Sequence, residues 1–169
     1  MSLATDHQVI TRENRLLAKA RPSRLSFTQM MAKAHQAMAS IAEDYLDWLE
    51  ADLKALQAAL RQLRDDGGDD RRALTEMFRI SHDVRGQGAT FDYALASQIS
   101  SSLCDFVERR STAHGLELLV IEAHIDALHA FLLYPVSGDG GAIGRDIMSG
   151  LSQLIEKANG PSMDLAKRD

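Results

Sequence analysis

The chain has 169 residues, of which 45% are hydrophobic and only 5% aromatic, and its formal net charge is −5. A chain of this length buries most of its unfolded surface in one core, so a single compact domain is expected, and the low aromatic content favours helices. The acidic balance, the lack of a Lys/Arg stripe and the charges within every apolar stretch argue against nucleic-acid binding and against membrane spans. No basic-then-apolar leader pattern is visible, so we expect a cytoplasmic protein without a membrane partner.

Residues 1–25 show little pattern and are interpreted as an N-terminal extension. A long first helix is predicted to begin near Ser26 or Thr28, because either side chain can cap backbone donors. Its apolar seam is clearest where leucines alternate three and four residues apart, at positions 46, 49, 53, 56, 60 and 63. The turn-forming run at residues 65–68 must end this helix.

The second predicted helix starts after Asp69 or Asp70 and carries His82. Its apolar positions cluster on one side at about 100° per residue. They are Ala73, Leu74, Met77, Ile80, Ser81 and Val84. Gly86 and Gly88 weaken the helix by up to about 1 kcal/mol each relative to Ala, so we expect it to end or bend within residues 86–92.

Two further helices complete the predicted bundle. One is indicated by apolar positions from Leu95 to Val107, and the next runs from Leu116 to about Tyr134, before Pro135. Four amphipathic helices in series with short loops predict an all-α, antiparallel four-helix bundle over residues 26–134. Residues 135–169 are expected to add a loop and a C-terminal helix, whose apolar positions begin at residue 143 and which ends at residues 159–161.

Common catalytic and metal-binding motifs are missing from the sequence, including HExxH, CxxC, GxSxG and the glycine-rich phosphate loop. We therefore predict no metal and no cofactor. The single cysteine, Cys104, lies between apolar positions and is interpreted as a small core residue. His124 and His129 are five residues apart, which does not place two ligands on one helix face, so both are interpreted as partly buried or surface histidines.

His82 differs because it lies about 120° away from the apolar face of its own helix, so we expect it to be exposed to solvent. A neutral imidazole leaves one ring nitrogen with a free lone pair that can attack phosphorus. Arg85, one turn further on, can bond phosphoryl oxygens, and Gly86 leaves room for the group and for a donor protein. Spacing alone leaves open that His82 is a surface histidine without a chemical role.

The segment ISHDVRGQGA, residues 80–89, resembles the signature of histidine phosphotransfer (HPt) domains, in which His, two residues, Lys or Arg, and then Gly open a run of small residues. His82, Arg85 and Gly86 match that motif at its own spacing. The resemblance covers roughly residues 46–134 and implies a four-helix bundle with an exposed phosphoacceptor. Two departures concern the loop after the helix, because Ala89 and Asp92 stand where the family usually has glycine.

The resemblance implies a phosphorelay carrier. His82 would accept a phosphoryl group from the aspartyl phosphate of a response-regulator receiver domain and pass it to another receiver, with Arg85 stabilising the group and Gly86 giving access. A hybrid histidine kinase is a further expected partner. The chain would have no ATP-dependent kinase activity of its own, and any Mg²⁺ would belong to the partner.

Two alternatives stay open at this point. Residues 81–85 also resemble the first half of the phosphoacceptor helix of sensor histidine kinases, although Gly86 and Gln87 replace the Thr and Pro expected there. The residues after His82 are needed for the bundle and contain no nucleotide-binding glycine motif, so this alternative is a detached dimerisation and phosphoacceptor module. The other is a helical interaction module that carries no phosphate.

Overall fold

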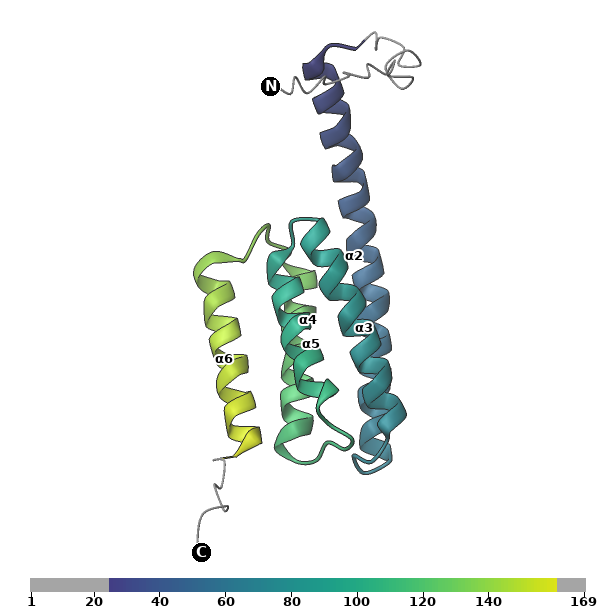
Figure 1. The fold of residues 1–169 in the computed structure, drawn as a ribbon, viewed down its shortest axis with the longest axis vertical. Coiled ribbons are helices and arrows are strands. Elements are labelled where there is room, and N and C mark those ends of the chain that lie inside the picture. Colours follow the sequence, from purple (N-terminus) through teal and green to yellow (C-terminus); the bar gives the residue numbers. More distant parts are fainter. Residues whose placement is uncertain (1–24, 161–169) are drawn as a thin grey trace, which may run out of the picture. The chain divides into compact units, whose positions relative to one another are not determined.

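The computed structural model describes residues 25–160, and within this range it contains five helices and no strand (Figure 1). The helices are α2 (Phe27–Asp65), α3 (Arg71–Thr90), α4 (Ala94–Glu108), α5 (Leu116–Leu133) and α6 (Gly141–Asn159). The predicted all-α class is confirmed for these residues. The predicted N-terminal extension, residues 1–25, lies outside the described part except for its last residue.

The chain divides into two compact units, and the boundary between them lies between Gln36 and Ala37, within α2. In the first unit, Ser26 begins the helix through a reciprocal capping box. The backbone N–H of Gln29 donates to Ser26 Oγ at 3.2 Å, and the backbone N–H of Ser26 donates to Gln29 Oε1 at 2.8 Å. Of the two predicted caps, Ser26 is therefore the one used.

In the second unit, Asp70 caps α3. Its Oδ1 accepts hydrogen bonds from the backbone N–H groups of Arg72 at 2.8 Å and Ala73 at 3.2 Å. These bonds, above all the one from Ala73, lower the pKa of the Asp70 carboxyl. The helix continues through both glycines and ends at Thr90, so its end falls within the predicted range but neither glycine breaks it.

A shared core joins the helices of the second unit. Apolar side chains of α2, α3, α4 and α5 line it, and α6 adds Leu151. The largest fully buried side chains are Tyr45, Leu49, Leu56, Leu63, Leu74, Met77, Ile80, Leu95, Ile99, Leu103, Ile121 and Ile125. The α3 helix packs against α4, while α5 packs against both α4 and α6. An ion pair of 2.7 Å between Arg64 and Glu122 joins the end of α2 to α5.

The loops are tied to one another by backbone hydrogen bonds. Ala113 N–H donates to the carbonyl of Gly68 at 2.8 Å, which holds the α4–α5 loop against the α2–α3 turn. Gly68 has φ +98°, and a Cβ atom there would collide with the carbonyl oxygen of Ala113, so only glycine fits. Gly138 N–H donates to the carbonyl of Asp92 at 2.6 Å, which joins the α5–α6 loop to the loop between α3 and α4.

The C-terminal helix α6 packs on α5 and α4, and its buried apolar side is shorter than predicted. Leu151 is buried and five other apolar side chains are partly buried, but Ile143 is 71% exposed. The predicted seam therefore contacts the core only from Ile147 onward. Within residues 25–160 no helix has both the length and the apolar character that a membrane span requires.

Candidate functional site

The α3 helix has a buried side and an exposed side, and His82 lies on the exposed one. Ser81 and Val84 are fully buried against the core, whereas the side chain of His82 is 55% exposed. Successive side chains are rotated by about 100° around the helix axis, so His82 points away from the core although Ser81, the residue before it, is buried. The predicted exposure of His82 is confirmed.

Close packing between α3 and α4 fixes the backbone that carries His82. A Cβ atom at Gly88 would lie 3.1 Å from both Ser97 N and the Tyr93 carbonyl oxygen, closer than ordinary contacts. Ser97 Oγ donates to the carbonyl of Arg85 at 2.7 Å. Phe78 lies one turn before His82, and its carbonyl accepts a hydrogen bond of 3.6 Å from Cys104 Sγ. The backbone of α3 is therefore fixed against α4 both before and after His82.

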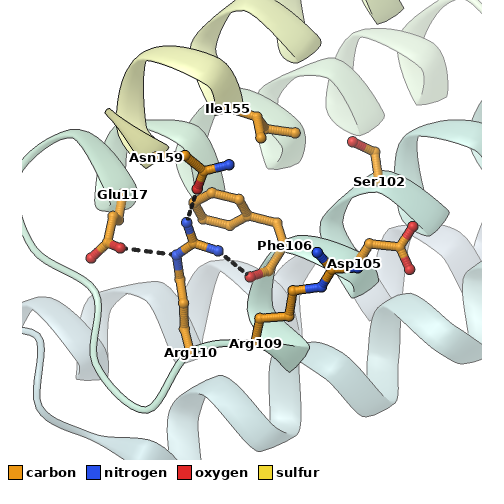
Figure 2. Close-up of a pocket in the computed structure, with 8 residues that line it drawn as sticks. All are labelled: Ser102, Asp105, Phe106, Arg109, Arg110, Glu117, Ile155 and Asn159. Atoms are coloured by element: carbon orange, nitrogen blue, oxygen red, sulfur yellow. Dashed lines mark hydrogen bonds and ion pairs between the residues drawn. The ribbon is translucent and has the colours of Figure 1, made fainter. Parts of the chain in front are cut away.

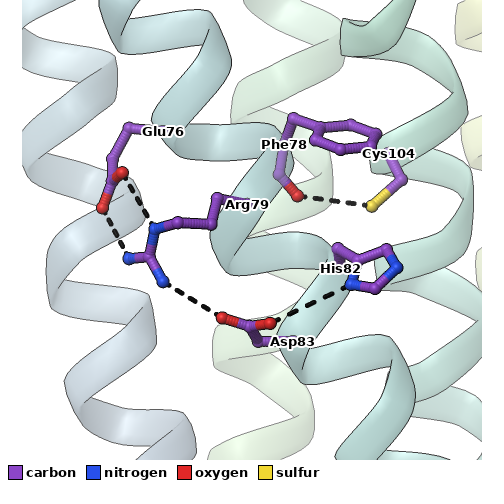
Figure 3. A network of polar contacts seen from close by, with 6 residues as sticks. All are labelled: Glu76, Phe78, Arg79, His82, Asp83 and Cys104. Atoms are coloured by element: carbon purple, nitrogen blue, oxygen red, sulfur yellow. Dashed lines mark hydrogen bonds and ion pairs between the residues drawn. The ribbon is translucent and has the colours of Figure 1, made fainter.

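Two contacts of the His82 imidazole are with residues of its own helix (Figure 3). The ring of Phe78, one turn earlier, lies with its centroid 6.1 Å from the imidazole centroid. The Asp83 Oδ1 atom lies 3.9 Å from His82 Nδ1, which is longer than a hydrogen bond but within ion-pair distance. These contacts leave the ring accessible from solvent.

A network of charged side chains continues from Asp83 along α3. Arg79 Nη1 donates to Asp83 Oδ2 at 3.0 Å. The same guanidinium donates twice to Glu76, from Nη2 at 2.6 Å and from Nε at 3.0 Å. The hydrogen bond from Arg79 lowers the pKa of the Glu76 carboxyl, and Glu76 in turn raises the pKa of Arg79, so both groups stay charged.

Arg85 and Gly86, the two other residues of the predicted site, are placed differently. Arg85 is half-buried, and among residues 25–160 no hydrogen bond joins its side chain to His82, but its charge opposes the effect of burial on the pKa of Cys104. Gly86 is exposed, and nothing lies within 4 Å of the position of a Cβ atom. The structure thus brings His82 and Gly86 to the open surface and leaves Arg85 half-buried.

Cys104 is a core residue, as the sequence predicts. It is 2% exposed, and burial raises the pKa of its thiol to about 11. A protonated thiol is a poor nucleophile and a poor metal ligand. Among residues 25–160, no group of three or more His, Cys, Asp and Glu side chains is arranged to hold a metal ion.

The interpretation of His124 as partly buried or on the surface was wrong, because the residue is fully buried. Its Nδ1 lies 2.7 Å from the carbonyl of Val120 and its Nε2 lies 2.9 Å from Ser102 Oγ. A carbonyl can only accept, so Nδ1 carries the proton and Nε2 accepts from the serine hydroxyl. Burial lowers the pKa of His124, which keeps the ring neutral. His129, by contrast, is exposed.

A cavity of about 560 Å³ lies where the end of α4 meets the start of α5 and the end of α6 (Figure 2). Arg110 is the central side chain, and its guanidinium donates to Glu117, to Asn159 and to the carbonyl of Phe106 at 3.0, 2.6 and 2.6 Å. It also lies 3.5 Å from the centroid of the Phe106 ring. Arg110 is therefore satisfied by the chain itself and links three helices, and His82 does not line this cavity.

The loop after α3 takes an unusual backbone conformation at Asp92. Its φ is +63°, in the left-handed region that glycine adopts readily and that Asp tolerates better than most residues. Sequence reasoning marked Asp92 as a departure from the HPt pattern, but it could not show that the backbone here has a glycine-like conformation. Ala89, the other departure, is an exposed helical residue.

Comparisons of this chain with family models, with curated proteins and with solved structures gave no match.

Proposed function

We propose that this chain is a phosphorelay carrier that receives a phosphoryl group on His82 from the aspartyl phosphate of a receiver domain and returns it to another receiver. The observation that carries the proposal is the contrast within one helical segment. Val84 and Gly88 are explained by packing, whereas His82 and Gly86 face solvent and nothing in the described fold requires them. A reactive imidazole next to an open glycine is what transfer between two proteins needs.

The transfer uses one ring nitrogen and no bound nucleotide. The lone pair of neutral His82 attacks phosphorus in line, an N–P bond forms, and the O–P bond to the partner's aspartate breaks. The electron pair of that bond leaves with the partner's carboxylate. Arg85 lies one turn further along α3, and a change of rotamer can bring its guanidinium to the phosphoryl oxygens. Any Mg²⁺ would come with the receiver.

We further propose that α2 to α5 form an antiparallel four-helix bundle of the HPt kind, with α6 as an addition. The shared core, the packing of α3 on α4 and of α4 on α5, and the ion pair between Arg64 and Glu122 support this arrangement. In such a bundle His82 stands midway along one helix, where a flat partner surface can reach it. A cytoplasmic location, where receiver domains could meet it, is part of the same proposal.

The test is incubation of the full chain with phosphorylated receiver domains, followed by an assay for acid-labile, alkali-stable phosphate. We expect rapid and reversible labelling of the wild type and none of His82→Gln. A matched control is His129→Gln, which removes an exposed histidine from α5 and should label normally. Equal labelling of the His82→Gln variant would contradict the proposal.

A second arm of this experiment separates the carrier from a kinase module. ATP and Mg²⁺ alone should give no labelling, because the described residues after His82 are occupied by helices and their connecting loops. Labelling of highly purified chain from ATP, lost in His82→Gln, would favour the kinase alternative.

A further inference from the structure

Ser102 of α4 and His124 of α5 form a hydrogen-bonded pair between the two helices. The Ser102 Oγ and His124 Nε2 atoms are 2.9 Å apart. Because Nδ1 of the ring donates to the carbonyl of Val120 at 2.7 Å, Nε2 carries no proton and accepts from the serine hydroxyl. Burial lowers the pKa of His124, so the ring is neutral and its Nε2 lone pair is available to take up a proton. The hydroxyl proton of Ser102 is therefore already directed at a base.

The two members of this pair differ in their access to solvent. His124 is fully buried, whereas Ser102 is half-buried and lines the cavity at the end of α4 (Figure 2). Since the hydroxyl proton is used in the bond to Nε2, the lone pairs of Ser102 Oγ remain for a molecule in the cavity. Covalent catalysis by serine needs a nucleophile bonded to a base that a third group orients, and here the third group is the carbonyl of Val120.

The cavity wall around Ser102 offers a cation and an apolar surface. Arg109 lies seven residues after Ser102 on the same side of α4 (Figure 2), and long helical side chains point back towards the start of their helix, so its guanidinium approaches the serine. Among residues 25–160 no hydrogen bond or ion pair holds the Arg109 side chain. Phe106 and Ile155 supply apolar wall. The volume of about 560 Å³ suits a small molecule.

We propose that Ser102 and His124 form a reactive centre, separate from His82, that hydrolyses small carboxylic esters held in this cavity. Ser102 Oγ attacks the ester carbonyl carbon, and its proton passes to His124 Nε2. The C–O bond to the alcohol then breaks, and the departing oxygen takes the proton from Nε2. Water attacks the acylated serine through the same base, which releases the carboxylic acid and returns a proton to Ser102 Oγ. The guanidinium of Arg109 stabilises the negative charge that develops on the carbonyl oxygen.

The first measurement needs no variant and uses the wild-type full chain with diisopropyl fluorophosphate, a reagent that modifies activated serines. A P–O bond to Ser102 forms, the P–F bond breaks, fluoride leaves, and His124 Nε2 takes up the hydroxyl proton. Mass spectrometry of the digested chain locates the adduct. We expect it on Ser102 and not on the neighbouring Ser101, which does not line the cavity. An unmodified Ser102, or equal modification of both serines, overturns the inference.

The second measurement follows hydrolysis of 4-nitrophenyl acetate by the release of 4-nitrophenolate. Exposed imidazoles also cleave aryl esters, so the chains compared all carry His82→Gln. Adding Ser102→Ala should lower the rate about hundredfold, whereas the matched control Ser101→Ala should leave it unchanged. Equal rates in these two variants overturn the inference. Circular dichroism checks that both fold, and if Ser102→Ala loses helix, the position of the adduct on the wild-type chain decides.

Discussion

The two sides of α3 between Ser81 and Gly88 have been built under different constraints. On the buried side, Gly88 lets the backbone of α4 approach so closely that a Cβ atom would stand 3.1 Å from Ser97 N. On the exposed side, Gly86 has open space around it and His82 is more than half exposed. Close packing against α4 therefore explains the glycine at position 88, but it does not explain the glycine at position 86. The residues that the fold does not explain are the ones that a function must explain.

The largest expected effect on this contrast comes from Gly88→Leu. The side chain has no space between α3 and α4, so the helices must separate or shift, at a cost of about 3 kcal/mol in the free energy of unfolding. Urea unfolding followed by circular dichroism measures it. Unchanged stability would show that α3 and α4 do not pack as closely as described.

The next effect concerns Arg85, which should act on transfer and not on folding. Arg85→Ala removes a charge-assisted hydrogen bond to the phosphoryl group, so transfer from a phosphorylated receiver should slow by about tenfold. The free energy of unfolding should change by no more than about 0.5 kcal/mol, because the side chain is not in the core. Single-turnover kinetics would test this, and normal transfer would remove Arg85 from the site.

Gly86→Ala is the matched opposite of the Gly88 variant, and its effect should be smaller and of opposite sign. Alanine is favoured over glycine in an exposed helix by up to about 1 kcal/mol, and no neighbour opposes the added Cβ. The variant should therefore unfold at a higher urea concentration than wild type. The larger Gly86→Leu should fold as well but weaken receiver binding by obstruction. Destabilisation by alanine would mean that Gly86 serves the fold after all.

The smallest effect separates the buried histidine from the exposed one. Because burial lowers the pKa of His124 below its ordinary value of 6.5, the unfolded chain binds a proton at higher pH than the folded chain does. Stability is therefore full above pH 6.5 and falls as the pH drops from 6.5 towards the lowered pKa. Urea unfolding across this range should show that slope in wild type and in His82→Gln, and lose it in His124→Leu. A slope that persists in His124→Leu would have another source.

Local signals in the sequence were sufficient for the helices. Each signal is part of the segment whose structure it predicts, so the predicted helix ends agree with the observed ones to within a few residues. The signals are the leucine spacing, the Ser26 and Asp70 caps and the turn formers at residues 65–68. The exposure of His82 followed from the same periodicity. Such signals need no knowledge of the partner helix.

Features that depend on a partner element were beyond the sequence. The burial of His124 needs Ser102 of α4 as a hydrogen-bond partner, and nothing near His124 in the chain indicates it. The same is true of Gly88, because the backbone atoms that leave no space for a side chain there belong to residues 93–97. The Arg79–Asp83 pair could have been found from its four-residue spacing, but its position beside His82 Nδ1 required coordinates.

The most direct test of the carrier function is the chemical stability of phosphate on the full chain after incubation with a phosphorylated receiver panel, compared between wild type, His82→Gln and His129→Gln. The predicted result is acid-labile, alkali-stable label on wild type and on His129→Gln, and none on His82→Gln. Label that persists in His82→Gln would contradict the assignment of His82 as the phosphoacceptor.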